Sequence, residues 1–412
     1  MNAATSRMLL VHVIRGTLLV AALGLAACQD DDDDYHGYYD TPNSVAIADM
    51  NGDGLDDIVF AATRIDGGYP NPGFAGVIAQ VAATPGTFQK SVNTGIGYNP
   101  STLSVGNLDG ASGPDVAVAN SASGNVSVLL HDATIATVQL QSARNVTTGG
   151  VPYDVTIADT NNDGLPDLTV ADAGASNNVI LIRRDPASAG NFLAPVTVAI
   201  GQPSTAVAIG DINADGRADL LVASIAPGGA GSISIFRQST TTAGAFAGRV
   251  DVAAGIEPLA IKIGDMNNDG LVDIVVANNG RSSNGAGVSI IMQDIINPGT
   301  FLAAVTYATP SGPVSVAIED LNADGRRDLV VANTGGSYSG TISVLLQDPT
   351  RPGVFLNATN YNGIYEPLGV AVGNLNGDAF PDIAIADGDR AAVMFQSTTT
   401  PGTFAGPVQV GR

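Results

Sequence analysis

Acidic side chains at alternate positions of a short loop are the residues of this chain best suited to chemistry. The loop at Asp49–Asp57 reads DMNGDGLDD, with oxygen-bearing side chains at positions 1, 3, 5 and 9 and glycine at position 6. Oxygens at alternate positions of a tight turn point toward one centre, and glycine permits the sharp reversal that brings them together. Hard oxygen ligands in a flexible loop favour Ca²⁺ over Mg²⁺, which demands octahedral geometry. The pattern therefore predicts a calcium loop.

The same loop recurs along the chain at a nearly constant spacing. Full copies start at Asp49, Asp159, Asp211, Asp265 and Asp320. Weaker copies start at Asn107 (NLDGASGPD) and Asn374 (NLNGDAFPD), and successive starts lie 52 to 58 residues apart. Simple Asx-rich turns are the alternative interpretation, but a turn does not require a third carboxylate at a fixed offset.

The expected ligands in each full loop are the side chains at positions 1, 3, 5 and 9 and the backbone carbonyl of position 7. The predicted metal residues are Asp49, Asn51, Asp53, Leu55, Asp57, Asp159, Asn161, Asp163, Leu165, Asp167, Asp211, Asn213, Asp215, Arg217, Asp219, Asp265, Asn267, Asp269, Leu271, Asp273, Asp320, Asn322, Asp324, Arg326 and Asp328. The last weak loop adds Asn374, Asn376, Asp378 and Asp382, although Ala379 replaces the glycine. The Asn107 loop has lost its central acid and glycine, so we expect about five strong calcium sites and one or two weak ones.

The segments around each loop predict what positions it. Each unit begins with a proline and a short apolar strand, then carries the acidic loop, a second strand, a Gly/Ser/Asn-rich loop and a third strand. A turn follows that ends in an aromatic residue, and a fourth strand leads to the next proline. The prolines are Pro42, Pro100, Pro152, Pro203, Pro258, Pro313 and Pro367, and the aromatics are Phe88, Phe192, Phe246, Phe301, Phe355 and Phe404, with Val138 near the equivalent place in the Asn107 unit.

Four short strands per unit, with no helical periodicity, are typical of a propeller blade. A single blade cannot bury both faces, so seven units predict an all-β, seven-bladed propeller with four antiparallel strands per blade over residues 41–412. The last unit has its own fourth strand, which ends at Val410. A straight solenoid is the structural alternative, but neither terminal unit has a polar cap. An EF-hand is excluded because strands flank the loop and Phe60, Val170 and Val276 occupy the position of its closing Glu.

With these repeats, the chain resembles the FG-GAP/VCBS repeat family over about residues 40–412, and so resembles the integrin alpha-chain propellers. The resemblance implies that a protein or glycan partner binds the face opposite the calcium hairpins. The candidates there are Tyr98, Tyr153, Tyr365 and Glu366, with Tyr39 and the loops Ile65–Phe74, Asn278–Gly287 and Asn333–Gly340. Packing between blades is the alternative role for each tyrosine. The lack of tryptophan weakens a lectin interpretation without excluding it.

The composition argues against two other classes of function. The formal net charge is -22, and the loop positions hold 15 acids in full copies and 4 in weak ones, so 19 of the 39 acids. An acidic chain is a poor ligand for nucleic acid, whose phosphates need Lys and Arg. Only three histidines are present, and no metalloprotease, P-loop or G-x-S-x-G motif occurs, so we expect no enzyme. We expect a monomer.

The N-terminal segment is predicted to be a targeting signal rather than part of the fold. Residues 1–27 carry two arginines and then an apolar run of about a dozen residues, which is too short to span a bilayer as a helix. The run ends in Leu25-Ala26-Ala27-Cys28, which resembles a bacterial lipobox with Cys28 as the lipidated residue. An ordinary secretory signal is the alternative. Residues 28–40 then form an acidic tether with five successive aspartates at 30–34.

The combined prediction is a calcium-binding propeller, anchored by lipid to the outer membrane, that acts as a binding or adhesion module. Its only membrane contact would be the lipid, on either the periplasmic or the outer surface. Two alternatives stay open. One is a periplasm-facing scaffold for envelope assembly, and the less favoured one is a hydrolase on a propeller scaffold.

Overall fold

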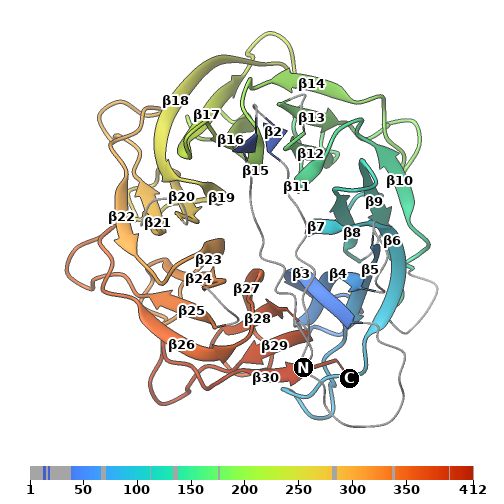
Figure 1. Ribbon diagram of the computed structural model, residues 1–412, viewed down its shortest axis with the longest axis vertical. Helices are drawn as coiled ribbons and strands as arrows, with labels where there is room; N and C mark the ends of the chain where they lie inside the picture. Colours follow the sequence, from blue (N-terminus) through green and yellow to red (C-terminus); the bar gives the residue numbers. More distant parts are fainter. Residues whose placement is uncertain are drawn as a thin grey trace, which may run out of the picture.

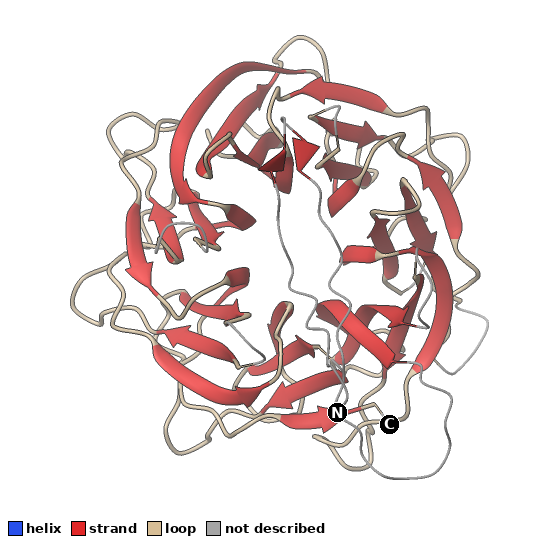
Figure 2. Cartoon of the chain, viewed as in Figure 1, coloured by secondary structure: helices blue, strands red, loops and turns tan. Residues whose placement is uncertain are grey.

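The chain folds into seven four-stranded sheets arranged around one axis (Figure 1). The structure is a computed structural model, and it describes residues 13–14, 17–18, 39–65, 71–111, 113–132, 138–174, 177–280, 285–335, 339–388 and 390–411. Every regular element in these residues is a strand (Figure 2). The prediction of an all-β propeller with seven blades of four antiparallel strands is confirmed.

Each blade consists of four consecutive strands, numbered here in chain order. The first three blades contain β3 (Tyr39–Ala48), β4 (Asp57–Ile65), β5 (Pro72–Ile78) and β6 (Val92–Tyr98); β7 (Pro100–Gly106), β8 (Asp115–Asn120), β9 (Asn125–Leu129) and β10 (Arg144–Thr147); β11 (Pro152–Ala158), β12 (Asp167–Asp172), β13 (Asn178–Ile182) and β14 (Val196–Ala199). Blade 4 contains β15 (Ser204–Gly210), β16 (Asp219–Ile225), β17 (Ala230–Gln238) and β18 (Phe246–Ile256).

The last three blades contain β19 (Pro258–Gly264), β20 (Asp273–Asn278), β21 (Gly287–Ile291) and β22 (Val305–Ala308); β23 (Pro313–Glu319), β24 (Asp328–Asn333), β25 (Gly340–Leu345) and β26 (Thr359–Ile364); β27 (Gly369–Gly373), β28 (Asp382–Asp387), β29 (Arg390–Met394) and β30 (Val408–Val410). A separate two-stranded sheet pairs β1 (Val13–Ile14) with β2 (Thr17–Leu18). No helix in the described part of the chain is long and apolar enough to cross a membrane.

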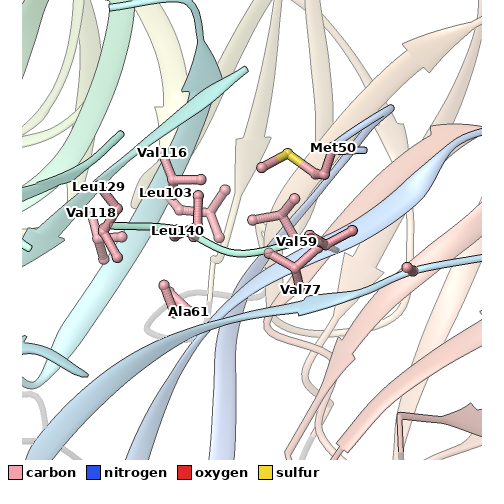
Figure 3. Packing of buried hydrophobic residues seen from close by; sticks show 12 residues of the cluster. Met50, Val59, Ala61, Val77, Leu103, Val116, Val118, Leu129 and Leu140 are labelled. Carbon is pink, nitrogen blue, oxygen red and sulfur yellow. The ribbon is translucent and has the colours of Figure 1, made fainter. Parts of the chain in front are cut away.

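The hydrophobic core lies between neighbouring blades. In the described residues, seven apolar clusters each join two adjacent blades, as the first does for blades 1 and 2 around Met50, Val59 and Leu129 (Figure 3). The middle strands are buried on both faces, and β8, β12, β20, β24 and β28 have no exposed residue. Burial of about 25 cal/mol per Å² of apolar surface makes these interfaces the main source of stability.

Small residues allow the blades to approach closely near the axis. A buried alanine occupies the same place on the second strand of every blade: Ala61, Ala119, Ala171, Ala223, Ala277, Ala332 and Ala386. At the end of the first strand, a Cβ on Gly210 would lie 2.4 Å from Ile263 of the next blade. A wedge-shaped blade has least room at its inner edge, so the sequence alternates small and large residues there.

The ring is closed by packing between blades 1 and 7, because each blade supplies all four of its own strands. Val45, Phe60 and Phe74 of blade 1 share one apolar cluster with Leu375 and Val393 of blade 7.

One polar contact joins the same two blades. The backbone N–H of Asn374 donates to Asp56 Oδ2 at 2.8 Å. Asp56 occupies position 8 of its loop, where the other loops have Pro, Ala, Val or Arg. This carboxylate therefore supports the closure of the ring.

One detail of the repeat alignment is wrong. The turn aromatics pair with a residue at or just beyond the end of the third strand, as Phe88 does with Gln80 and Phe301 with Gln293. In blade 2 the residue at this place is Leu140, which pairs with His131, and not the nearby Val138. His131 and Leu140 are nine positions apart, whereas pairs such as Gln80 and Phe88 are eight apart, so the turn in this blade is one residue longer.

Candidate functional site

All seven acidic loops lie on one face of the ring, where each joins the first two strands of its blade. Within the hairpins, the last residue of the first strand pairs with position 9 of the loop, as Gly264 does with Asp273. Antiparallel connections alternate between the two ends of a sheet. The turns between the third and fourth strands therefore share the face of the acidic loops, which we call the loop face.

The aspartate at position 9 joins each hairpin to the third strand of its blade. One carboxylate oxygen accepts the backbone N–H of position 2 at 2.6 to 3.3 Å. The other oxygen accepts, at 2.7 to 2.8 Å, the N–H of a residue at or two positions beyond the end of the third strand. The seven residues are Asp57, Asp115, Asp167, Asp219, Asp273, Asp328 and Asp382. Because the contact occurs in the weak loops too, this carboxylate has a role in folding that needs no metal.

Position 2 anchors each loop in the core between two blades. Its side chain is fully or almost fully buried in all seven loops, as Met50, Leu108, Thr160, Ile212, Met266, Leu321 and Leu375. Met266 packs against blade 6, for example, in the cluster that contains Leu329 and Phe355. A change in loop conformation is therefore transmitted directly to the packing between blades.

Positions 1, 3 and 5 of the full loops turn their oxygens toward the backbone of the loop. In the Asp265 loop, Gly270 N–H donates to Asp265 Oδ2 at 2.9 Å and Asp269 N–H donates to Asn267 Oδ1 at 3.0 Å. Leu271 N–H donates to Asp269 Oδ1 at 2.9 Å. The loops at Asp49, Asp159, Asp211 and Asp320 form the same three contacts. These oxygens thus surround one tight turn.

The oxygen atoms of a full loop are of the chemical types that Ca²⁺ prefers as ligands. It offers carboxylate, amide and carbonyl oxygens only, and each oxygen that accepts one N–H retains a further lone pair. In the described residues, however, no three Asp, Glu, His or Cys side chains form a group that could hold a metal ion. The position 9 carboxylate faces two backbone N–H groups, which separates it from the acids at positions 1 and 5.

Burial and neighbouring acids perturb the position 9 carboxylates. Burial raises the pKa to about 6 for Asp57, Asp273, Asp328 and Asp382, and the other loop carboxylates add to this rise, while the backbone N–H bonds oppose it. The pKa values of Asp115, Asp167 and Asp219 are raised for the same first reason. A nearby cation would relieve this accumulation of negative charge.

Two full loops carry an arginine at position 7 that contacts their own acid. Arg326 Nη2 lies 2.6 Å from Asp324 Oδ2, and Arg217 Nη1 lies 3.5 Å from Asp215 Oδ2. The three remaining full loops have leucine at this position. The guanidinium neutralises one of the three carboxylates, so the full loops divide into two electrostatic classes. The sequence prediction used only the backbone carbonyl of Arg217 and Arg326 and did not separate these classes.

The weak loops use amide side chains to hold the turn. Asn107 Nδ2 donates to the carbonyl of Ala111 at 2.5 Å, and Asn374 Nδ2 donates to the carbonyl of Asp378 at 2.5 Å. At position 1, the weak loops therefore have an amide N–H₂ donor where the full loops have a carboxylate oxygen. The Asn374 loop still has Asp378 at position 5, whereas the Asn107 loop has no acid there.

The predicted partner-binding residues lie on the opposite face with different exposures. Tyr98 is 47% exposed, whereas Glu366 is 9% exposed and its backbone N–H donates to Asp387. Tyr153 lies on β11, where burial raises the pKa of its phenol. Tyr365 N–H also donates to Asp387. Tyr98 therefore offers the most accessible side chain of the four.

Several other predicted features fall wholly or partly outside the described residues. They are the lipidated Cys28 and the acidic aspartate run, the centre of the loops Ile65–Phe74, Asn278–Gly287 and Asn333–Gly340, and the side chain of Tyr39.

A family model of FG-GAP-like repeats matches the chain at residues 159–222, 265–331 and 320–385. Each matched range contains two of the acidic loops, so the chain contains FG-GAP-like repeats. No curated protein sequence matches the chain.

Two solved structures match this chain at low sequence identity. A crystal structure of a protein from Lactobacillus plantarum has a TM-score of 0.53 and 17% sequence identity, over 80% of this chain and 86% of that chain. The exotype rhamnogalacturonan lyase YesX has a TM-score of 0.48 and 15% identity, over 84% of this chain and 70% of that chain. At such identities the Lactobacillus plantarum protein is a relative in fold alone.

Proposed function

We propose that the protein is a calcium-binding propeller whose full loops each hold one Ca²⁺ ion. The observation that carries this proposal is the arrangement of carboxylate and amide oxygens around one tight turn in each of the five loops. Bound Ca²⁺ would offset the repulsion between acids at positions 1 and 5. Because position 2 is buried between blades, an ordered loop would also stabilise the blade interface.

The protein's melting temperature and metal content test this proposal together. Protein purified in calcium should contain about five Ca²⁺ ions per chain by elemental analysis and should melt at a lower temperature after treatment with EGTA. At 1 mM Ca²⁺ and a Kd of about 10⁻⁴ M, each site would contribute about 1.4 kcal/mol. Added Ca²⁺ should restore the melting temperature. An unchanged melt in EGTA, with no metal in the purified protein, would contradict the proposal.

We further propose that the propeller is a lipid-anchored binding or adhesion module of the bacterial cell envelope. The sequence Leu25-Ala26-Ala27-Cys28 and the acidic tether support the anchor. The face opposite the loop face, with Tyr98 exposed on it, is the proposed contact surface for a protein or glycan.

Labelling with radioactive palmitate tests the anchor, with Cys28→Ser as the variant that should lose the label. Protease treatment of intact cells, with lysed cells as the control, then tests the location. Cleavage on intact cells would support adhesion outside the cell. Protection until lysis would instead favour the periplasm-facing scaffold. Calcium must be held constant, since bound calcium would protect the propeller from proteases and imitate protection by the membrane.

A further inference from the structure

The first strand of each blade is its innermost strand. At one equivalent position of these seven strands, one blade has a large side chain where the others have small ones. On each first strand, one residue pairs with the residue two places after the position 9 aspartate, so these seven residues lie at the same level of the ring. We call this level the inner ring. Its members are Ala46, Ser104, Thr156, Ala208, Lys262, Ala317 and Ala371. Six are small, as the narrow inner edge requires, and the seventh is a lysine.

The Lys262 side chain is exposed at the axis of the propeller. Both flanks of its blade are covered, because one apolar cluster joins blades 4 and 5 and another joins blades 5 and 6. Ile261, the preceding residue, is only 4% exposed, and Val275, opposite Lys262 on β20, is fully buried. Lys262 itself is exposed. On an innermost strand, that exposure can lie only at the inner edge of the ring.

Lys262 is a rare cation in this chain, and its charge is not neutralised by direct contact. The sequence contains 17 Lys and Arg residues, of which only Lys90 and Lys262 are lysines. Among the described residues, no hydrogen bond or ion pair to Lys262 is found. An ammonium group strongly favours an anionic or oxygen-rich partner.

Polar side chains gather on the first strands of blades 2 and 3. The strand β7 lies across the axis from β19, and β11 lies two blades from β19 around the ring (Figure 1). They place Ser104 and Thr156 at the level of Lys262. Ser104 Oγ accepts Ile157 N–H at 3.3 Å, so its own proton is available to a ligand.

Asp154 lies two residues before Thr156 on the same strand and adds a negative charge on this side. Its two oxygens accept the N–H groups of Val155 at 3.0 Å and Val207 at 2.9 Å. Burial raises the pKa of Asp154, and the positive charge of Lys262 opposes this rise, although the two groups form no ion pair. The inner edge is therefore asymmetric, with hydroxyls and a carboxylate on blades 2 and 3, an ammonium on blade 5 and alanine at the other four places of the inner ring.

We propose that the inner ring binds a small hydroxylated monocarboxylate, with its carboxylate at Lys262 and its hydroxyls toward Ser104 and Thr156. One ammonium matches one negative charge, and a polyanion would be repelled by a chain of net charge -22. The hydroxyls of Ser and Thr both donate and accept, which suits the hydroxyl groups of such a ligand. This site is independent of the calcium loops and of the opposite face.

Amine labelling of the intact protein tests the site because the chain has only two lysines. The probe is D-glucuronate, and D-glucose is the control that lacks only the carboxylate. Acetylation at Lys262 and Lys90 is followed by mass spectrometry. At ten times its Kd, glucuronate should slow acetylation of Lys262 about tenfold, by simple occupancy, and leave Lys90 unchanged. Glucose should protect neither lysine.

Two matched variants complete the test by calorimetry with glucuronate. Lys262→Met should abolish the binding heat, and Lys90→Met should retain it. Equal labelling of Lys262 with and without glucuronate, gluconate and lactate would overturn the proposal. So would protection that NaCl reproduces at equal ionic strength, because that would be screening alone. If Lys262→Met fails to fold, the labelling of the wild-type protein still decides the question.

Discussion

The Asp265 and Asn107 loops occupy equivalent hairpins but retain different parts of the motif. Both bury an apolar residue at position 2, Met266 or Leu108, and both close with an aspartate whose oxygens accept the same two backbone N–H groups. Only the Asp265 loop has acids at positions 1 and 5 with glycine at position 6. The comparison separates a structural pair, positions 2 and 9, from the set proposed to bind metal, positions 1, 3 and 5.

This distinction changes the role that we assign to the third carboxylate of each loop, the aspartate at position 9. In the sequence, an aspartate at a fixed offset argued for calcium against an ordinary turn. The structure supplies a second reason for it, because the hairpin and the third strand each need an acceptor for a buried N–H. The alternating oxygens at positions 1, 3 and 5 are therefore the more selective evidence for a metal.

The largest effect is expected from the aspartate that both loops share. Asp273→Ala and Asp115→Ala each leave two buried N–H groups without an acceptor, at about 1 to 3 kcal/mol per group. Urea unfolding in EGTA, followed by tyrosine fluorescence, should show a loss of about 2 to 6 kcal/mol for either variant. A large loss for Asp273→Ala with none for Asp115→Ala would show that the two loops do not share this contact.

A smaller effect should distinguish the set proposed to bind metal. Asp269→Ala removes the acid at position 5 and should reduce the calcium content by one ion per chain, with a loss of about 1.4 kcal/mol in 1 mM Ca²⁺ and little change in EGTA. Its matched control is Asp109→Ala in the Asn107 loop, which should leave the calcium content unchanged. Equal calcium loss in both variants, measured by elemental analysis, would remove the distinction between full and weak loops.

The smallest effect concerns the arginine at position 7. Arg326→Leu removes the guanidinium beside Asp324 and makes the Asp320 loop resemble the Asp265 loop. Because such partly exposed ion pairs contribute about 0 to 1 kcal/mol, calcium affinity at this loop should rise by up to about fivefold. The reverse change, Leu271→Arg, should weaken the Asp265 loop. Calorimetric titration of both variants checks this, and affinities that do not change in opposite directions would contradict it.

Much of the fold was predictable because each repeat carries residues that mark where its strands and loops lie. Seven prolines, seven loops and six turn aromatics mark the same places in each blade, and strand-length apolar runs lie between them. The placement of Leu140 was not predictable, since the longer turn in blade 2 breaks the spacing that the other units share. Contacts between residues far apart in the sequence were also not predictable from local spacing. One example is the contact of Asn374 with Asp56, which are 318 positions apart.

The sequence by itself determined the seven blades, the loop face and the chemical type of the proposed metal ligands, because these depend on local spacing along the chain. Only the tertiary structure decided that the position 9 carboxylate also accepts an N–H group from beyond the hairpin, as Asp273 does from Gln293, whereas the acids at positions 1 and 5 accept N–H groups of their own turn. The same holds for Lys262. On its strand it is one polar residue among apolar ones, and it becomes distinctive only where seven strands converge on one axis.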